Sequence, residues 1–108
     1  MKFYIETFTP KQAWLDLTKE ERAEYMNKVG LSSQPLVEQG GEVVVMSEND
    51  SDTVQGLSHQ FFVIWKFPTD ELAKSFESLG LSEGWYDYFE QFNLKGSSSD
   101  IIERLISL

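Results

Sequence analysis

Aromatic and β-branched residues are concentrated in four stretches of the chain, and this pattern predicts four strands. Residues 2–8 (KFYIETF) and 60–67 (QFFVIWKF) carry such residues at most positions, and the short apolar run 42–47 (EVVVMS) suits a buried strand. Residues 89–94 predict a fourth strand. The polar segment 48–58 contains Asp, Ser and Gly, so it predicts a loop that joins two strands as a long hairpin.

Helix signals follow the first strand. Pro10 suits the first turn of a short helix, and Thr18 with Glu21 forms a capping box before a longer one. The end of that longer helix has two interpretations. It stops near Gly30 with a second helical piece after it, or it continues as one kinked helix through Pro35 to residue 39.

Two more helices are predicted in the second half. Thr69 is a cap for a helix that ends at Gly80, and its apolar residues recur at helical spacing: Leu72, Phe76 and Leu79. An aromatic junction covers 84–89. Asp100 begins a terminal helix as the first member of a second capping box, with apolar residues along one side: Ile101, Leu105 and Leu108.

The predicted order is β-α-β-β-α-β plus a C-terminal helix, which is typical of an α+β, ferredoxin-like fold. Residues 1–108 are expected to form a single domain. Alternation along the strands predicts a core between helices and sheet made of Phe3, Ile5, Val63, Trp65, Leu72 and Phe76. The opposite sheet face is predicted to carry an apolar patch of Tyr4, Phe8, Val44, Met46, Phe62 and Ile64. We expect a second copy to bury this patch, which makes the chain a homodimer; the alternative is that the terminal helix covers it.

Composition excludes several classes of function. With 18 acidic and 9 basic residues the net charge is −9, which disfavours nucleic acid and anionic membranes as partners. Cysteine is absent, so disulfides and thiolate chemistry are excluded. No apolar run is long enough to span a bilayer, and the start lacks a secretion signal, so a cytoplasmic location is expected.

No cofactor fingerprint or metal motif is present. A single histidine rules out a site with several histidines within one chain. Residues 48–52 (ENDSD) resemble half of a calcium loop but lack its glycine and its acidic final ligand, so a solvated hairpin loop is the better interpretation. We therefore predict neither a metal nor a cofactor.

Three stretches carry a resemblance to a known family. The segments FYIETFTP (3–10), FVIWKFP (62–68) and GWYDYFEQ (84–91) resemble a family of short, uncharacterised bacterial proteins that is similar to the dimeric α+β barrel superfamily. That superfamily includes quinone-type monooxygenases, haem-degrading enzymes, muconolactone isomerases and ligand-binding sensors. The resemblance implies the fold and a dimer, and it transfers no catalytic residue. Haem binding is disfavoured because the only histidine lies in a loop.

The candidate ligand-binding residues are Tyr4, Glu6, His59, Trp65, Trp85 and Asn93. His59 is expected at the mouth of a pocket, where an imidazole suits proton transfer; the alternative is a surface loop histidine. Glu6 is expected to form an ion pair with Lys66 or, with a raised pKa, to act as a base. The aromatic side chains suit either a core or a pocket for a flat aromatic or apolar ligand. Two functions therefore remain: a small-molecule-binding or cofactor-free enzyme-like domain, or a non-catalytic interaction protein that acts as a homodimer.

Overall fold

Four antiparallel strands form one sheet. In the computed structural model, which describes residues 1–50 and 52–108, the strands are β1 (Lys2–Pro10), β2 (Glu42–Glu48), β3 (Phe61–Phe67) and β4 (Phe89–Gly96). Their order across the sheet is β2-β3-β1-β4. The four predicted strands are confirmed, and the protein is an α+β fold.

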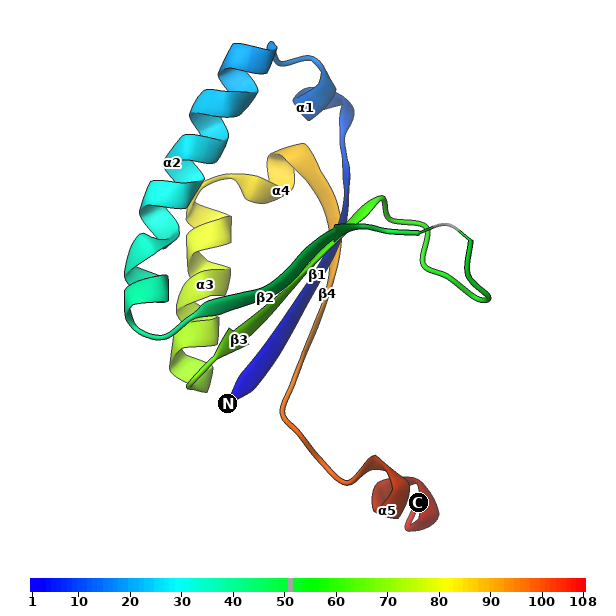
Figure 1. The fold of residues 1–108 in the computed structure, drawn as a ribbon. Helices are drawn as coiled ribbons and strands as arrows, with labels where there is room; N and C mark the ends of the chain where they lie inside the picture. Colours follow the sequence, from blue (N-terminus) through cyan, green and yellow to red (C-terminus); the bar gives the residue numbers. More distant parts are fainter. Residues whose placement is uncertain (51) are drawn as a thin grey trace.

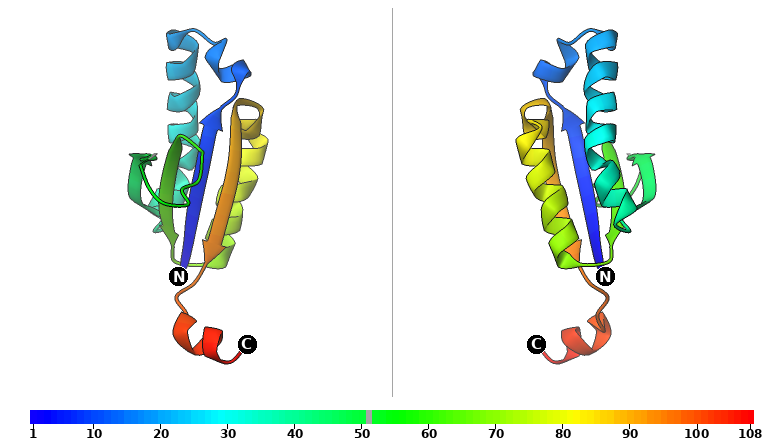
Figure 2. Two further views of the ribbon diagram at one scale, coloured as in Figure 1. Left: turned by 90° about the vertical axis from the view of Figure 1, so that its right-hand side faces the viewer. Right: turned by 90° about the vertical axis from the view of Figure 1, so that its left-hand side faces the viewer.

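Helices cover one face of this sheet. The described residues form α1 (Gln12–Leu15), α2 (Lys19–Glu38), α3 (Asp70–Ser82), α4 (Trp85–Tyr88) and α5 (Ile101–Ile106). Figure 1 and Figure 2 show α2 and α3 side by side on the same face, with α5 beyond the end of the sheet. None of the helices in the described part of the chain is long and apolar enough to cross a membrane.

The caps of α2, α3 and α5 agree with the sequence signals, whereas Pro10 was wrongly predicted in the first helical turn: it ends β1, and α1 begins at Gln12. Thr18 and Glu21 form the predicted capping box, with hydrogen bonds of 3.1 and 2.9 Å. Thr69 caps α3, which runs two residues beyond Gly80. Helix α2 is continuous to Glu38 with Pro35 inside it, so the second of the two interpretations of its end is confirmed. Of the second capping box, Asp100 accepts from the backbone N–H of Glu103.

The pairing register shows which face of the sheet each strand residue lies on, because two residues directly opposite each other on neighbouring strands point to the same face. Tyr4 pairs with Trp65, and Ile5 pairs with Ile64. Tyr4, Glu6 and Phe8 therefore face the helices. The prediction for this strand was wrong: Phe3 and Ile5 lie on the open face. Both alternating sets of β1 contain apolar residues, so periodicity does not distinguish them.

A β-bulge between Val43 and Val45 changes the face of β2 residues. Val43 pairs with Trp65 and Met46 pairs with Val63, so both lie on the helix side. The prediction that placed Met46 on the open face was therefore wrong. It assumed strict alternation of side chains along the strand, and a β-bulge interrupts that alternation.

The core lies between α3, the C-terminal end of α2 and the sheet. Its buried members are Tyr4, Leu36, Trp65, Phe67, Leu72 and Ala73, with Val43, Val63, Phe76 and Leu79 packed against them. Four predicted core residues are confirmed: Val63, Trp65, Leu72 and Phe76. The aromatic rings pack closely, with the centroid of Phe76 5.0 Å from that of Trp65 and 5.3 Å from that of Tyr4.

Candidate functional site

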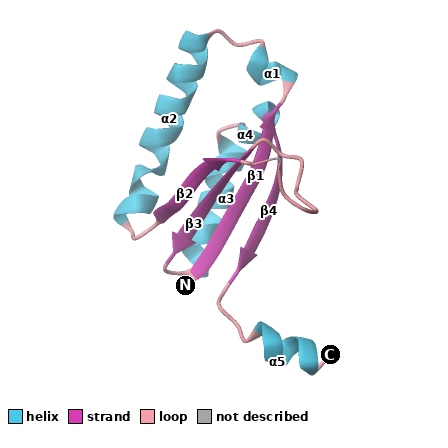
Figure 3. Cartoon of the chain, turned by 45° about the vertical axis from the view of Figure 1, so that its right-hand side comes forward, coloured by secondary structure: helices cyan, strands magenta, loops and turns pink. Residues whose placement is uncertain are grey.

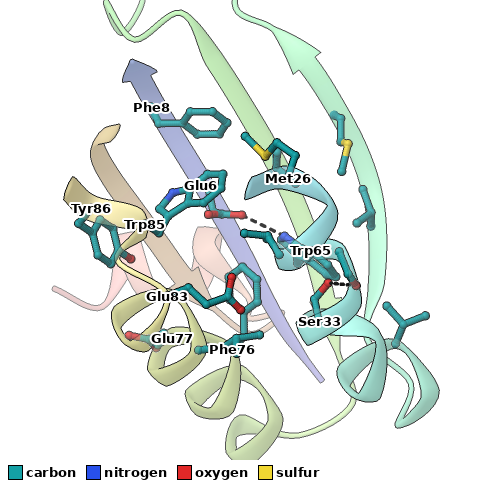
Figure 4. Close-up of a pocket in the computed structure, with 18 residues that line it drawn as sticks. Glu6, Phe8, Met26, Ser33, Trp65, Phe76, Glu77, Glu83, Trp85 and Tyr86 are labelled. Atoms are coloured by element: carbon teal, nitrogen blue, oxygen red, sulfur yellow. Dashed lines mark hydrogen bonds between the residues drawn. The ribbon is translucent and has the colours of Figure 1, made fainter. Parts of the chain in front are cut away.

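A cavity of about 510 Å³ lies between the helices and the sheet. This volume is within the usual range of small-molecule pockets. Figure 4 shows side chains from α2, α3, β1, β3 and the α4 segment around it. Most lining residues are apolar or aromatic; the full set is Glu6, Phe8, Met26, Val29, Gly30, Ser33, Val37, Val43, Met46, Val63, Trp65, Phe76, Glu77, Leu79, Gly80, Glu83, Trp85 and Tyr86.

Helix α2 forms one wall of the cavity and is anchored to the rest of the protein on either side of it. Leu36 is the buried residue of this helix and joins the core at its C-terminal end. Near its start, Tyr25 packs against Trp14, and its hydroxyl donates to the backbone oxygen of Glu83 at 3.0 Å. Between these anchors the helix presents Gly30, where an added Cβ would meet no atom within 4 Å. The missing side chain leaves open space.

Glu6 supplies a buried carboxylate to this cavity. Its exposed fraction is 8%. Trp65 donates its indole N–H to Oε1 at 3.0 Å, and Gln91 donates its amide N–H to Oε2 at 2.9 Å. Each oxygen keeps capacity for a further hydrogen bond, because a carboxylate has about four acceptor positions.

Gln91 connects Glu6 to a wider polar network. Its amide oxygen accepts from the indole N–H of Trp85 at 2.7 Å, and its amide nitrogen also donates to Asn93 at 2.8 Å. Asn93 in turn donates to the hydroxyl of Tyr86 at 3.3 Å. The position of Glu6 is therefore set by neutral donors from β3 and β4.

Burial raises the pKa of Glu6 above its ordinary value, while the hydrogen bonds from Gln91 and Trp65 act in the opposite direction. A carboxyl group with a raised pKa holds a proton more readily than an ordinary glutamate does, and its place beside an apolar cavity brings it within reach of a bound molecule. It also recognises a ligand that carries a hydrogen-bond donor.

Two further carboxylates line the cavity in different surroundings. Glu77 lies 3.3 Å from the ammonium group of Lys95, which also contacts Asp70 at 3.3 Å. Glu83 has a buried Oε1 with no hydrogen-bond partner in the described structure. The backbone of Glu83 is held in place by Tyr25, whose hydroxyl donates to its carbonyl oxygen. Burial raises the pKa of Tyr25 to about 12, so this hydroxyl keeps its proton.

The structure brings half of the predicted site residues to the cavity wall: Glu6, Trp65 and Trp85. Tyr4 lies on the same sheet face but in the core, where burial raises its pKa. Asn93 joins the site through Gln91 and Tyr86.

The predicted ion pair between Glu6 and Lys66 is absent from the described structure. Lys66 pairs with Phe3 in the sheet, so it lies on the face opposite Glu6. Its ammonium group instead lies 3.7 Å from Glu42. The alternative reading of Glu6, a carboxyl with a raised pKa, agrees in direction with its buried surroundings.

His59 lies on the opposite face of the sheet from this cavity. It is only 5% exposed, its ring stacks on Phe92 at 5.0 Å, and Nδ1 is 2.9 Å from Oγ1 of Thr7. The Thr7 hydroxyl donates its one proton to the backbone oxygen of Phe92. Nδ1 must therefore donate to Thr7. His59 borders a separate, smaller cavity of about 240 Å³ within the β2–β3 loop.

Sequence reasoning missed Gln91, Glu83 and Gly30. Gln91 lies two residues before Asn93 on β4 and therefore on the same face. Because Asn93 was a predicted site residue, alternation along this strand could have identified Gln91 as well. Glu83 and Gly30 carry no signal of their own, because their importance depends on how α2 and α3 approach the sheet.

The described residues contain no group of three or more His, Cys, Asp or Glu side chains placed to hold a metal ion. Within residues 48–52, Asp50 accepts from the backbone N–H of Asp52 at 3.0 Å, and Ser51 lies outside the described residues.

Comparison with known proteins gives a family but no activity. No curated protein matches the sequence. A family of unknown function, DUF6616, matches residues 1–108. Its match extends over the strands, the helices and the cavity residues alike, and the chain therefore belongs to this family of unknown function, DUF6616.

Proposed function

We propose that the chain is one ferredoxin-like domain that binds a small, largely apolar molecule in the cavity between its helices and its sheet. The observation that carries this proposal is a cavity of about 510 Å³ with a buried, hydrogen-bonded carboxylate in its wall. Apolar cavities with a few fixed polar groups are typical of small-molecule sites. The element order and the strand order β2-β3-β1-β4 support the ferredoxin-like assignment.

The polar network supports binding rather than a purely structural core. A protein interior usually fills its space, and the apolar surface that this open cavity leaves exposed to water is unfavourable unless something covers it. Trp65 and Gln91 nevertheless hold Glu6 in one orientation at the wall of this space. A fixed acceptor beside apolar surface recognises a molecule with a lipophilic body and one polar group.

A neutral fluorescent probe tests the proposal. N-phenyl-1-naphthylamine emits strongly in apolar surroundings, so we expect saturable enhancement when it is titrated with the protein. Gly30→Leu is the matched variant, because its side chain would extend into the open space found at this position. We expect it to fold and to lose the enhancement. Equal enhancement in both proteins would place the probe elsewhere and contradict the proposal.

A second candidate function, homodimerisation through the open sheet face, is favoured by the exposed apolar side chains on that face. Phe92 and Leu94 on the edge strand β4 are 62% and 65% exposed, and Val45 on the opposite edge strand, β2, is 37% exposed. Phe62 and Ile64 of the predicted patch remain on this face, while Phe3 and Ile5 replace Tyr4 and Phe8. The occupant we propose is a second copy, because a two-fold axis buries one apolar face against itself.

The alternative cover within one chain receives no support from the position of α5. This helix lies beyond the end of the sheet (Figure 3), and its own apolar residues Ile101 and Leu105 are about 60% exposed. Within the described part of the chain, apolar side chains of both the open face and α5 therefore stay exposed. A dimer through the open face would bury those of the sheet.

A further inference from the structure

The charges around the cavity have one sign. Its three ionisable carboxylates are Glu6, Glu77 and Glu83, and its lining contains no Lys, Arg or His. Glu77 has a cation close by in Lys95. For Glu6 and Glu83 the described residues provide no basic group within ion-pair distance: Glu6 meets neutral donors, and Oε1 of Glu83 is buried without any partner.

Such an arrangement is costly for the protein alone. The buried Oε1 of Glu83 accepts no hydrogen bond, so it loses its hydration without replacement, and burial of Glu6 disfavours the charged form of its carboxyl group. Figure 4 shows Glu6 from the sheet and Glu83 from the end of α3 reaching into the same cavity. A ligand with a positive, donor-rich group relieves both costs at once.

We propose that the cavity binds a lipophilic primary amine. This inference rests on the proposed function and names the class of its ligand. The ammonium group faces Glu6 and Glu83, to which it donates charge-assisted hydrogen bonds. The hydrocarbon part lies against the apolar wall formed by Val63, Phe76 and Leu79. An anionic ligand is disfavoured because it would bring a third negative charge to two uncompensated ones.

Three ligands with the same hydrocarbon chain separate the effect of the head group from that of the cavity. n-Octylamine, which is protonated at neutral pH as a lysine side chain is, is compared with 1-octanol and octanoate by isothermal titration calorimetry. We expect octylamine to bind at least about tenfold more tightly than octanol, and octanoate to bind most weakly. If octanol or octanoate binds as tightly as octylamine, the amine assignment is wrong, but the proposed binding site is still supported. Absence of binding by all three would overturn both.

Glu83→Gln is the variant that tests the amine contact, because Oε1 of Glu83 has no hydrogen bond to lose. We expect it to weaken octylamine binding by about tenfold and octanol binding by much less, because octanol makes a neutral hydrogen bond only. Glu24→Gln, on the exposed side of α2, is the matched control for the loss of one negative charge. If Glu24→Gln weakens octylamine binding as much as Glu83→Gln does, the preference comes from net charge and the assignment is wrong.

Discussion

Trp65 donates its indole N–H to Oε1 of Glu6 at 3.0 Å, across the adjacent strands β3 and β1. Both groups are unfavourable in a core without a partner, the indole because of its single donor and the carboxylate because of its charge. Their contact satisfies the indole, and Gln91 satisfies the second oxygen of the carboxylate. This pairing explains how an acidic residue is tolerated on the buried face of β1.

The pH dependence of stability is expected to show the burial of Glu6. Its pKa is raised in the folded state, so its contribution to stability is complete below the pKa of an unfolded glutamate and is lost as pH rises through the folded-state pKa. Glu6→Gln removes this titration but places an amide against the donor of Gln91. We expect the variant to be less stable than the wild type at acid pH, and the deficit to shrink toward neutral pH.

Urea unfolding of both proteins across that pH range measures the effect. The deficit should shrink by about 1.4 kcal/mol for each unit by which the folded-state pKa is raised. Glu24→Gln serves as the control for the loss of charge at an exposed position. A deficit that stays constant with pH would show that Glu6 titrates alike in the folded and unfolded chains.

Phe76 is expected to be a major contributor to stability. Its ring contacts Tyr4, Trp65 and Phe67, with centroids within 5.3 Å. Phe76→Ala should lower the free energy of unfolding by about 3 kcal/mol, at the low end for such truncations because the ring is half-buried. Leu31→Ala, at an exposed position of α2, should stay within about 0.5 kcal/mol. A loss below about 1 kcal/mol for Phe76→Ala would be inconsistent with this core.

Two glycines are expected to respond in opposite directions to alanine. At Gly30 a Cβ meets open space within a helix, so Gly30→Ala should stabilise the protein by about 0.5 to 1 kcal/mol. At Gly41 the same atom would lie 2.9 Å from the backbone oxygen of Leu36 and 3.1 Å from the Phe67 ring. Gly41→Ala should therefore destabilise. If urea unfolding gives the same change in the free energy of unfolding for both variants, the open space at Gly30 and the close packing at Gly41 are not as described.

His59 is expected to support the fold and to leave the main cavity unaffected. Because it is buried, stacked on Phe92 and hydrogen-bonded to Thr7, His59→Ala should cost about 1 to 2 kcal/mol. Binding of N-phenyl-1-naphthylamine should not change. The sequence-based placement of His59 at the mouth of a ligand pocket would instead give a loss of ligand affinity. Melting curves and probe titrations of the same variant distinguish the two.

The oligomeric state tests the proposed role of the open sheet face. Light scattering after size exclusion should give twice the chain mass of 12.5 kDa. Leu94→Asp should convert this species to monomer, since Leu94 is 65% exposed in one chain and its change strains no core packing. Leu31→Asp, equally exposed on α2, is the control and should remain dimeric. A wild-type mass of 12.5 kDa across a dilution series would exclude the dimer.

Strong local signals made much of the fold predictable. The alternation in β3 placed Val63 and Trp65 on the helix side, and Thr18 with Glu21 marked the start of α2. The face of β1 was not predictable in the same way. An acidic residue mid-strand normally indicates solvent, and only the donors from Trp65 and Gln91 reverse that rule for Glu6.

The candidate site was predictable only in part, for a physical reason. Aromatic residues and a mid-strand carboxylate are visible in the sequence, so Glu6, Trp65 and Trp85 were found. The cavity itself depends on how far α2 stands from the sheet, which results from contacts at its two ends between residues distant in sequence. The bulge in β2 that turns Met46 toward the cavity likewise has no local signature.

The most direct test of the binding site uses the three tryptophan indole N–H signals in a proton–nitrogen correlation spectrum. Trp65 and Trp85 line the cavity, while Trp14 packs against Tyr25, Tyr88 and Phe89 outside its wall. On titration with N-phenyl-1-naphthylamine, the signals of Trp65 and Trp85 should move together and saturate, and that of Trp14 should move far less. Stationary signals from Trp65 and Trp85 at saturating probe, or a shift confined to Trp14, would contradict the assignment of this cavity as the binding site.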